Sequence, residues 1–108
     1  MTNSLKIGLA QLNPKVGDVA GNLAKVRAAR AQAAAQGADL VLYAETVLSG
    51  YPPEDLVLKP AFQKACHDAV EALRADTADG GPALFVTTPW REDDKLHNAI
   101  IALSLIHI

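Results

Sequence analysis

The feature that most constrains the fold is the apolar run Leu40–Ala44, which ends directly in Glu45. With Asp39 it is predicted to form a strand, and its unbroken apolar character predicts that both faces are covered, as in a parallel or sandwiched sheet. A carboxylate that opens a loop at the carboxyl end of such a strand stands where α/β enzymes place reactive groups. Partial desolvation there would make Glu45 a usable base near neutral pH. The alternative is that Glu45 is an ordinary polar residue at the end of a strand.

Hydrophobic periodicity predicts an alternation of strands and helices along the rest of the chain. The predicted strands are 5–12, 39–44, 83–88 and 96–103, and the predicted helices are about 19–36 and 60–78. The order β-α-β-α-β-β indicates an α/β fold whose last two strands form a hairpin through the polar turn at 91–95. In the first strand Leu5, Ile7 and Leu9 share one face, which is predicted to be the buried face.

The ends and the faces of both helices are also predicted. Asp18 is the expected N-cap of the first helix, and Gly37 suits the position just after its last turn. Arg30 falls within the apolar stripe of this helix and is the one violation of the pattern. Pro60 suits the first turn of the second helix. The apolar stripe of the second helix consists of Phe62, Ala65, Cys66, Ala69, Val70 and Leu73.

Other candidates for chemistry are few. Cys66 is the only thiol, and its place on an apolar stripe predicts a packing residue, because burial raises the pKa of a thiol and leaves it inert. His67, His97 and His107 have neither the spacing nor the cysteine partners of a metal site, so none is expected. His97, beside Asn98, could line a cleft, although a hydrogen-bonded strand histidine is the more ordinary role. The glycines form no phosphate-binding loop, and we expect no cofactor in this segment.

Composition and charge narrow the possible partners. The chain has 108 residues, 50% of them apolar and 20% charged, which suits one small globular domain. A net charge of −2 with scattered lysines and arginines argues against nucleic acid. No apolar run approaches the roughly 18 residues of a membrane helix. A single cysteine, and no signal-peptide pattern after Met1, predict a cytoplasmic protein.

The loop Tyr51–Asp55 is the second informative stretch. Pro52 and Pro53 each fix a φ angle and so pre-organise the loop. Such a loop could hold the Tyr51 hydroxyl near a reacting centre. The alternative is a stiff connector that only delivers the chain to the second helix.

Three stretches together resemble the nitrilase, or carbon–nitrogen hydrolase, superfamily. They are the opening strand Ile7–Pro14, the segment Gly37–Val41 and the strand that ends in Glu45. The resemblance covers residues 5 to about 103. Within the superfamily, the run Gly50–Leu56 is similar to that of the glutaminase domains of glutamine-dependent NAD⁺ synthetases.

The chain also departs from the pattern of the superfamily. Ala44 stands where the superfamily usually has proline before the glutamate, and Thr87-Thr88-Pro89 replaces a more usual Val-Gly-x-Pro step. Asn98 matches an asparagine that the superfamily places in its fourth strand, where tyrosine often stands at the position of His97.

The resemblance implies an α-β-β-α sandwich, of which this chain would be an N-terminal fragment. It implies a Glu-Lys-Cys triad in which Glu45 is the general base, with the lysine and the nucleophilic cysteine outside this chain. Tyr51 matches a tyrosine of the glutamine pocket. In the full-length protein, hydrolysis of the glutamine amide would supply ammonia for the ATP-dependent amidation of nicotinic acid adenine dinucleotide to NAD⁺. A separate domain would use ATP and Mg²⁺ for that step, and the full-length protein is expected to be a homo-oligomer.

The chain ends inside its last predicted strand, so it is expected to be a fragment. Residues 1–103 would be the N-terminal part of a carbon–nitrogen hydrolase (glutaminase) domain, and residues 104–108 an apolar tail. That this tail is non-native sequence is a further hypothesis. The fragment itself is expected to be inactive, because it lacks the nucleophilic cysteine and the lysine. Two alternatives stay open: another amidase or carbamoylase of the superfamily, and a non-catalytic α/β fragment in which Glu45 only ends a strand.

Overall fold

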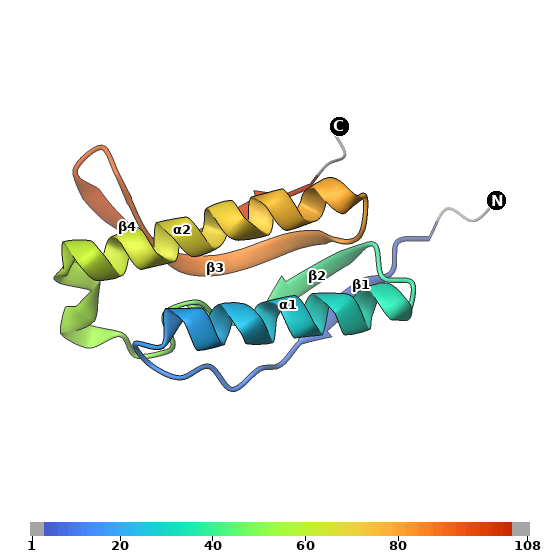
Figure 1. The fold of residues 1–108 in the computed structure, drawn as a ribbon, viewed down its shortest axis with the longest axis horizontal. Helices are drawn as coiled ribbons and strands as arrows, with labels where there is room; N and C mark the ends of the chain where they lie inside the picture. Colours follow the sequence, from blue (N-terminus) through green and yellow to red (C-terminus); the bar gives the residue numbers. More distant parts are fainter. Residues whose placement is uncertain (1–3, 105–108) are drawn as a thin grey trace.

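A computed structural model describes residues 4–104, which form one four-stranded sheet with two helices packed on it (Figure 1). The main elements are β1 (Ile7–Ala10), α1 (Val19–Ala35), β2 (Leu40–Tyr43), α2 (Pro60–Asp76), β3 (Ala83–Glu92) and β4 (Lys95–Leu103). Two short 3-10 helices, η1 (Glu54–Leu58) and η2 (Thr77–Asp79), flank α2. The predicted order is therefore confirmed. Of the apolar tail at 104–108, residues 105–108 lie outside the described residues, and so does His107.

The strands follow the order β1-β2-β3-β4, with parallel pairing of the first three and antiparallel pairing of β3 with β4. Two consecutive crossovers that step in the same direction place both helices on one face, because such crossovers share one hand. Figure 1 shows α1 and α2 lying beside each other over the sheet. No helix within residues 4–104 is long and apolar enough to cross a membrane.

Local sequence signals set the ends of the helices. The Asp18 side chain accepts a hydrogen bond of 3.0 Å from the amide of Gly21, which confirms the predicted N-cap of α1. Gly37 has a φ of +81°, the left-handed conformation expected just after a helix. Pro60 begins α2 as predicted. The chain then tightens into η2, so α2 ends two residues before the predicted end at residue 78.

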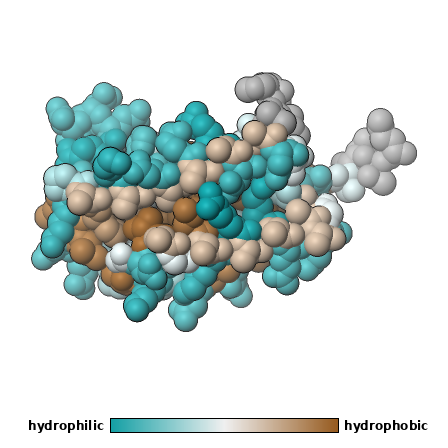
Figure 2. Space-filling model, viewed as in Figure 1, coloured by the Kyte–Doolittle hydropathy of each residue, from teal (hydrophilic) through white to brown (hydrophobic). Residues whose placement is uncertain are grey.

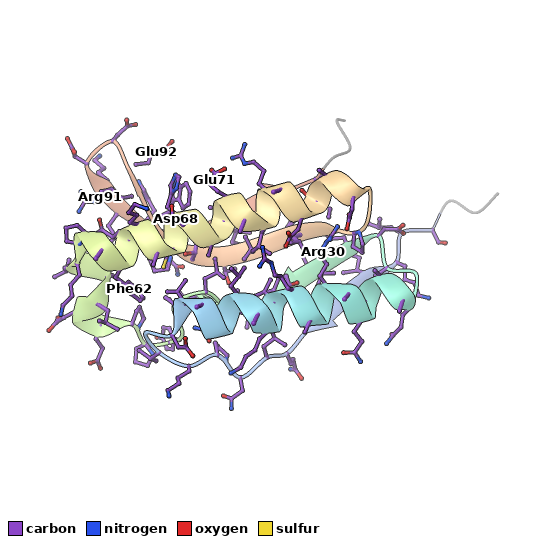
Figure 3. All side chains as sticks on the ribbon, viewed as in Figure 1. Arg30, Phe62, Asp68, Glu71, Arg91 and Glu92 are labelled. Carbon is purple, nitrogen blue, oxygen red and sulfur yellow. The ribbon has the colours of Figure 1, made fainter. Side chains whose placement is uncertain are left out.

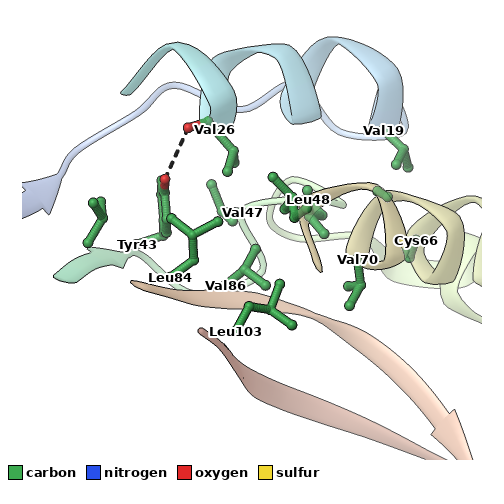
Figure 4. Packing of buried hydrophobic residues seen from close by; sticks show 13 residues of the cluster. Val19, Val26, Tyr43, Val47, Leu48, Cys66, Val70, Leu84, Val86 and Leu103 are labelled. Carbon is green, nitrogen blue, oxygen red and sulfur yellow. Dashed lines mark hydrogen bonds between the residues drawn. The ribbon is translucent and has the colours of Figure 1, made fainter. Parts of the chain in front are cut away.

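The hydrophobic core lies between the helices and the sheet. The predicted stripe of α2 is confirmed, since Cys66, Ala69, Val70 and Leu73 are all buried. Figure 2 shows hydrophobic atoms along the seam between the helices and polar atoms on their outer sides. In Figure 4 the Tyr43 hydroxyl donates a hydrogen bond of 3.0 Å to the carbonyl of Val26. Burial raises the pKa of Tyr43 to about 12.

The opposite face of the sheet is open, and here the prediction for the first strand was wrong. Leu5 and Leu9 are 64% and 76% exposed, and Ile7 is exposed as well. Helix α1 packs on the face that carries Gly8, where an added Cβ would lie 3.4 Å from the Cβ of Ala33. The small residues of β1 therefore admit the helix, and the large ones face away from it.

The prediction that β2 is covered on both faces was also wrong. Val41 and Tyr43 are buried beneath the helices, whereas Leu40 and Leu42 are only half-buried. Within residues 4–104, no second layer covers the face of Leu40 and Leu42.

Arg30, the violation in the stripe of α1, is buried with partners. Its Nη2 lies 2.8 Å from Oδ1 of Asp79, and its Nε donates to the carbonyl of Pro82 at 3.0 Å. Figure 3 shows Arg30 between α1 and α2, while Asp68 and Glu71 lie on the outer side of α2. Hydrogen bonds from Arg30 and from the amide of Gly81 lower the pKa of Asp79 to about 2. The arginine thus ties α1 to the turn that follows α2.

The hairpin is longer than predicted. Strand β3 continues to Glu92 and β4 begins at Lys95, so the turn shrinks to Asp93 and Asp94. Both turn residues have positive φ values, 52° and 62°, the conformation favoured in tight hairpin turns. The longer hairpin carries β4 past the end of β2, where Glu45 lies.

Candidate active site

Glu45 follows the carboxyl end of β2 and meets the hairpin. Its Oε1 accepts a hydrogen bond of 2.6 Å from Nδ2 of Asn98 on β4. The expected desolvation of Glu45 is not found, because the residue is exposed and nothing within residues 4–104 packs over it. The structure therefore brings together two residues that are far apart in the sequence and leaves them open to solvent.

A strained turn carries Glu45. The next residue, Thr46, has a φ of +48°, a left-handed conformation that is uncommon for a β-branched residue. The Thr87 hydroxyl on β3 donates a hydrogen bond to the carbonyl of Ala44 and accepts one of 2.9 Å from the amide of Val47. The backbone around Glu45 is thus fixed from the neighbouring strand.

A hollow of about 270 Å³ lies beside this turn. It is lined by Glu45, Thr46, Tyr51, Pro53, Val57, Pro89, Leu96, His97 and Asn98. Glu45 and Tyr51, the two residues chosen from the sequence, therefore line the same hollow. Tyr51 and His97 are exposed, and of the two roles considered for His97 the structure favours the cleft.

Sequence reasoning missed the roles of Thr46 and Thr87. A signal was present for Thr87, because parallel strands end at the same edge of a sheet and Thr87 lies near the end of the predicted strand 83–88, which pairs with the strand before Glu45. The sequence pointed to Asn98 only as the neighbour of His97 in a possible cleft and through the resemblance to the superfamily. Its bond to Glu45 depends on the register that pairs it with Pro89, which the pattern alone does not give.

Cys66 lies apart from this hollow, in the core beneath α2. Burial raises the pKa of its thiol, and the Thr88 hydroxyl offsets this in part. The predicted packing role of Cys66 is therefore confirmed. Among residues 4–104, no three His, Cys, Asp or Glu side chains gather in a way that could hold a metal ion.

An aromatic contact between α2 and β3 covers an edge of the core. The His67 and Trp90 rings stack with centroids 4.7 Å apart and an angle of 17° between their planes. His67 is on the exposed side of α2, and Trp90 is half-buried against the core.

The fold and the hollow define a layered α/β domain with a carboxylate held at the carboxyl end of a parallel strand. The chain belongs to the carbon–nitrogen hydrolase family, whose sequence profile matches residues 6–105. The glutamine-dependent NAD⁺ synthetase of Rhodobacter capsulatus is 46% identical over 99 residues, which cover 92% of this chain and 18% of that protein. The chain therefore spans less than a fifth of the length of the curated relatives it matches, from 12% to 18%.

Solved structures give the same result. The glutamine-dependent NAD⁺ synthetase from Acinetobacter baumannii, in complex with adenosine diphosphate, matches 93% of this chain and 19% of its own with a TM-score of 0.85 and 28% identity. An amidase from Nesterenkonia sp. AN1 matches 82% of this chain and 35% of its own with a TM-score of 0.73 and 29% identity. That amidase structure is of a glutamate-to-glutamine mutant in which acrylamide has added to the active-site cysteine. These findings confirm the resemblance to the superfamily and, within it, to glutamine-dependent NAD⁺ synthetases.

Proposed function

We propose that this chain supplies the general base, Glu45, of a glutamine-hydrolysing site in a full-length glutamine-dependent NAD⁺ synthetase. The observation that carries the proposal is the Glu45 carboxylate, held by Asn98 at 2.6 Å in the wall of a hollow, in a chain of the carbon–nitrogen hydrolase family. The identity to synthetases from several bacteria favours glutamine over other amides.

In the proposed mechanism, Glu45 takes the proton from a cysteine thiol supplied by the rest of the full-length protein. The thiolate attacks the side-chain amide carbon of glutamine, and a lysine helps to stabilise the resulting oxyanion. The protonated Glu45 returns its proton to the departing nitrogen, so that ammonia leaves and a glutamyl thioester remains. Glu45 then deprotonates a water molecule, which cleaves the thioester to glutamate and restores the thiol.

The hollow beside Glu45 would receive the glutamine side chain. Tyr51 stands at its wall with an exposed ring, so its hydroxyl can reach a bound substrate. We place Tyr51 in the glutamine pocket. His97 and Asn98 line the same wall, and Asn98 would keep one carboxylate oxygen of Glu45 occupied while the other meets the thiol.

The ammonia would serve the amidation of nicotinic acid adenine dinucleotide to NAD⁺ in a separate domain that uses ATP and Mg²⁺. The adenosine diphosphate bound to the Acinetobacter baumannii synthetase supports nucleotide use by such a domain. We further propose that the full-length protein is a cytoplasmic homo-oligomer.

The 108-residue chain alone should be inactive, because its one thiol, Cys66, is buried in the core away from Glu45. Purified chain should release no ammonia from glutamine above the buffer rate in a coupled glutamate dehydrogenase assay. Release at a rate comparable to that of the full-length protein would refute this part of the proposal.

The main test compares Glu45→Gln with Glu54→Gln in the full-length protein. Glu54 is a control of the same residue type, since it is also exposed but does not line the hollow. Loss of a general base typically costs about 10²- to 10⁴-fold in rate, and Glu45→Gln should lower ammonia release from glutamine by at least that much, while Glu54→Gln keeps the wild-type rate.

Two outcomes would favour the alternatives. Full activity in Glu45→Gln would mean that the residue only ends a strand and is not catalytic. A wild-type protein that ignores glutamine but hydrolyses another small amide or a carbamoyl compound from a substrate panel would be an amidase or carbamoylase instead.

A further inference from the structure

We propose that Thr87 is a positioning residue for Glu45, acting through the backbone turn from which Glu45 projects. The inference rests on the proposed function, because it assigns Thr87 a part in the same reaction. Thr87 does not line the hollow, and its hydroxyl acts on main-chain atoms rather than on the carboxylate.

The first support is the double contact of one hydroxyl. Thr87 Oγ1 donates to the carbonyl of Ala44 and accepts from the amide of Val47, so a single side chain joins the two peptide groups on either side of Glu45 and Thr46. The main chain continues the link, since the amide of Leu48 donates to the carbonyl of Thr87 at 3.3 Å. No other side chain among residues 4–104 bonds both ends of this turn.

The second support is the left-handed conformation of Thr46, which lies between the two backbone groups bonded by the Thr87 hydroxyl. We call this pair of hydrogen bonds the Thr87 clamp. A φ of +48° is strained for a β-branched residue, and such a conformation persists only where its surroundings impose it. Thr46 is 4% exposed, and its Oγ1 has no hydrogen-bond partner among the described residues. Its own side chain therefore gives the turn no compensating bond. The Thr46 carbonyl accepts from the amide of Gly50 at 2.9 Å and from the Ser49 hydroxyl at 3.4 Å, and Thr87 adds the side-chain restraint from the neighbouring strand.

The third support is burial. Thr87 is 5% exposed, so water cannot readily replace its hydroxyl if the side chain is changed. The amide of Val47 would then lose its acceptor, and Thr46 could relax to a negative φ. Such a change would swing Glu45 away from Asn98, and misplacement of a catalytic group by about 1 Å can cost about 10²-fold in rate.

The test measures glutamine hydrolysis by the full-length protein with Thr87→Val, Thr87→Ser and Thr88→Val. Thr88 is a matched control on the same strand, because it is fully buried and its hydroxyl bonds to the carbonyl of Pro89 rather than to the turn. We expect Thr87→Val to lower kcat by about 10- to 100-fold with KM changed less than about threefold. The kcat of Thr87→Ser should stay within about threefold of the wild-type value. Thr88→Val should keep the wild-type kcat while lowering Tm.

A double-mutant cycle separates positioning from a general structural effect. If Thr87 acts only through Glu45, Thr87→Val added to Glu45→Gln should cause no further loss of kcat. Additive losses of kcat in the double variant would overturn the inference. An unchanged kcat in Thr87→Val, or an equal loss of kcat in Thr88→Val, would also overturn it. So would a kcat of Thr87→Ser as low as that of Thr87→Val. Should Thr87→Val fail to fold, Thr87→Ala, which also lacks the hydroxyl, is subject to the same criteria.

The wild-type protein separates this inference from the proposed function. An inactive wild type would refute the proposed function and the inference with it. An active wild type with an unaffected Thr87 variant would refute only the role of Thr87.

Discussion

The two faces of the sheet differ in how completely this chain covers them. On the helix side Leu73 and Leu84 are fully buried, and even Arg30 is buried, with its Nε donating to the carbonyl of the buried Pro82. On the other side Leu9 and Ile100 are largely exposed. Asn98 lies two residues before Ile100 on β4 and so shares its face, since side chains alternate along a strand. The candidate site is thus built on the face that residues 4–104 leave open, which explains why its geometry is formed while Glu45 remains solvated.

The largest expected effect is on the free energy of unfolding, and it tests directly how the two faces of the sheet differ in their coverage. In the full-length protein, Leu73→Ala and Leu9→Ala should each lower the free energy of unfolding by about 2–5 kcal/mol, if further protein covers the open face. In the 108-residue chain only Leu73→Ala should do so, and Leu9→Ala should stay within about 0.5 kcal/mol. Urea titrations of both substitutions in both proteins measure the change in the free energy of unfolding. An equal loss for Leu9→Ala in the full-length protein and in the 108-residue chain would contradict the difference between the two faces.

A smaller effect is expected at the ion pairs on the helix side. Arg30→Met should lower the free energy of unfolding by about 1–3 kcal/mol, because it leaves the buried carbonyl of Pro82 without its donor. Arg27 pairs with Asp76 at 2.7 Å but is half-exposed, so Arg27→Met should cost at most about 1 kcal/mol. Chemical denaturation in the full-length protein measures both, and equal costs would show that burial of Arg30 adds nothing.

On the open side, Asn98→Ala should act on activity rather than on stability. Loss of the 2.6 Å bond frees the Glu45 carboxylate, and we expect kcat for glutamine hydrolysis to fall about tenfold. In the 108-residue chain, where Asn98 is exposed, the same substitution should leave Tm unchanged. A drop in Tm with no change in kcat would show that the contact is structural.

The smallest effect is a pH dependence at the helix side. The pKa of Asp79 is lowered to about 2 from its ordinary value of 3.8, first by the hydrogen bond from Arg30. The unfolded chain therefore binds this proton more readily than the folded protein, so the stabilisation is present above pH 4 and is lost as the pH falls through about 2. The difference in Tm between wild type and Asp79→Asn should shrink on acidification over that range. A difference independent of pH would contradict the assigned pairing.

Local patterns were enough for the element order, the Asp18 cap and the buried stripe of α2, because these depend on neighbours a few residues apart. The covered face of β1 could not be predicted the same way. Leu5, Ile7 and Leu9 are the larger side chains, yet the crossover helix packs on the side of the small residues. The partner of Arg30 and the clamp by Thr87 join segments that only the tertiary fold brings together, so a sequence pattern shows the polar residue but not its contact.

For the site, the sequence indicated Glu45 and Tyr51, and the structure places both in the wall of one hollow. The sequence did not predict the hydrogen bond from Asn98 to Glu45, which depends on the register of the hairpin. It also did not predict the left-handed turn at Thr46. A threonine carries no local signal for a positive φ, which neighbours impose on it.

The most direct test of the central claim is a crystal structure of the full-length protein that contains this chain. The account expects a carboxylate oxygen of Glu45 within hydrogen-bond reach of a cysteine Sγ, at about 3–3.5 Å, with Asn98 still on the other oxygen. A Glu45 side chain that points into bulk solvent, far from any sulfur, would contradict it.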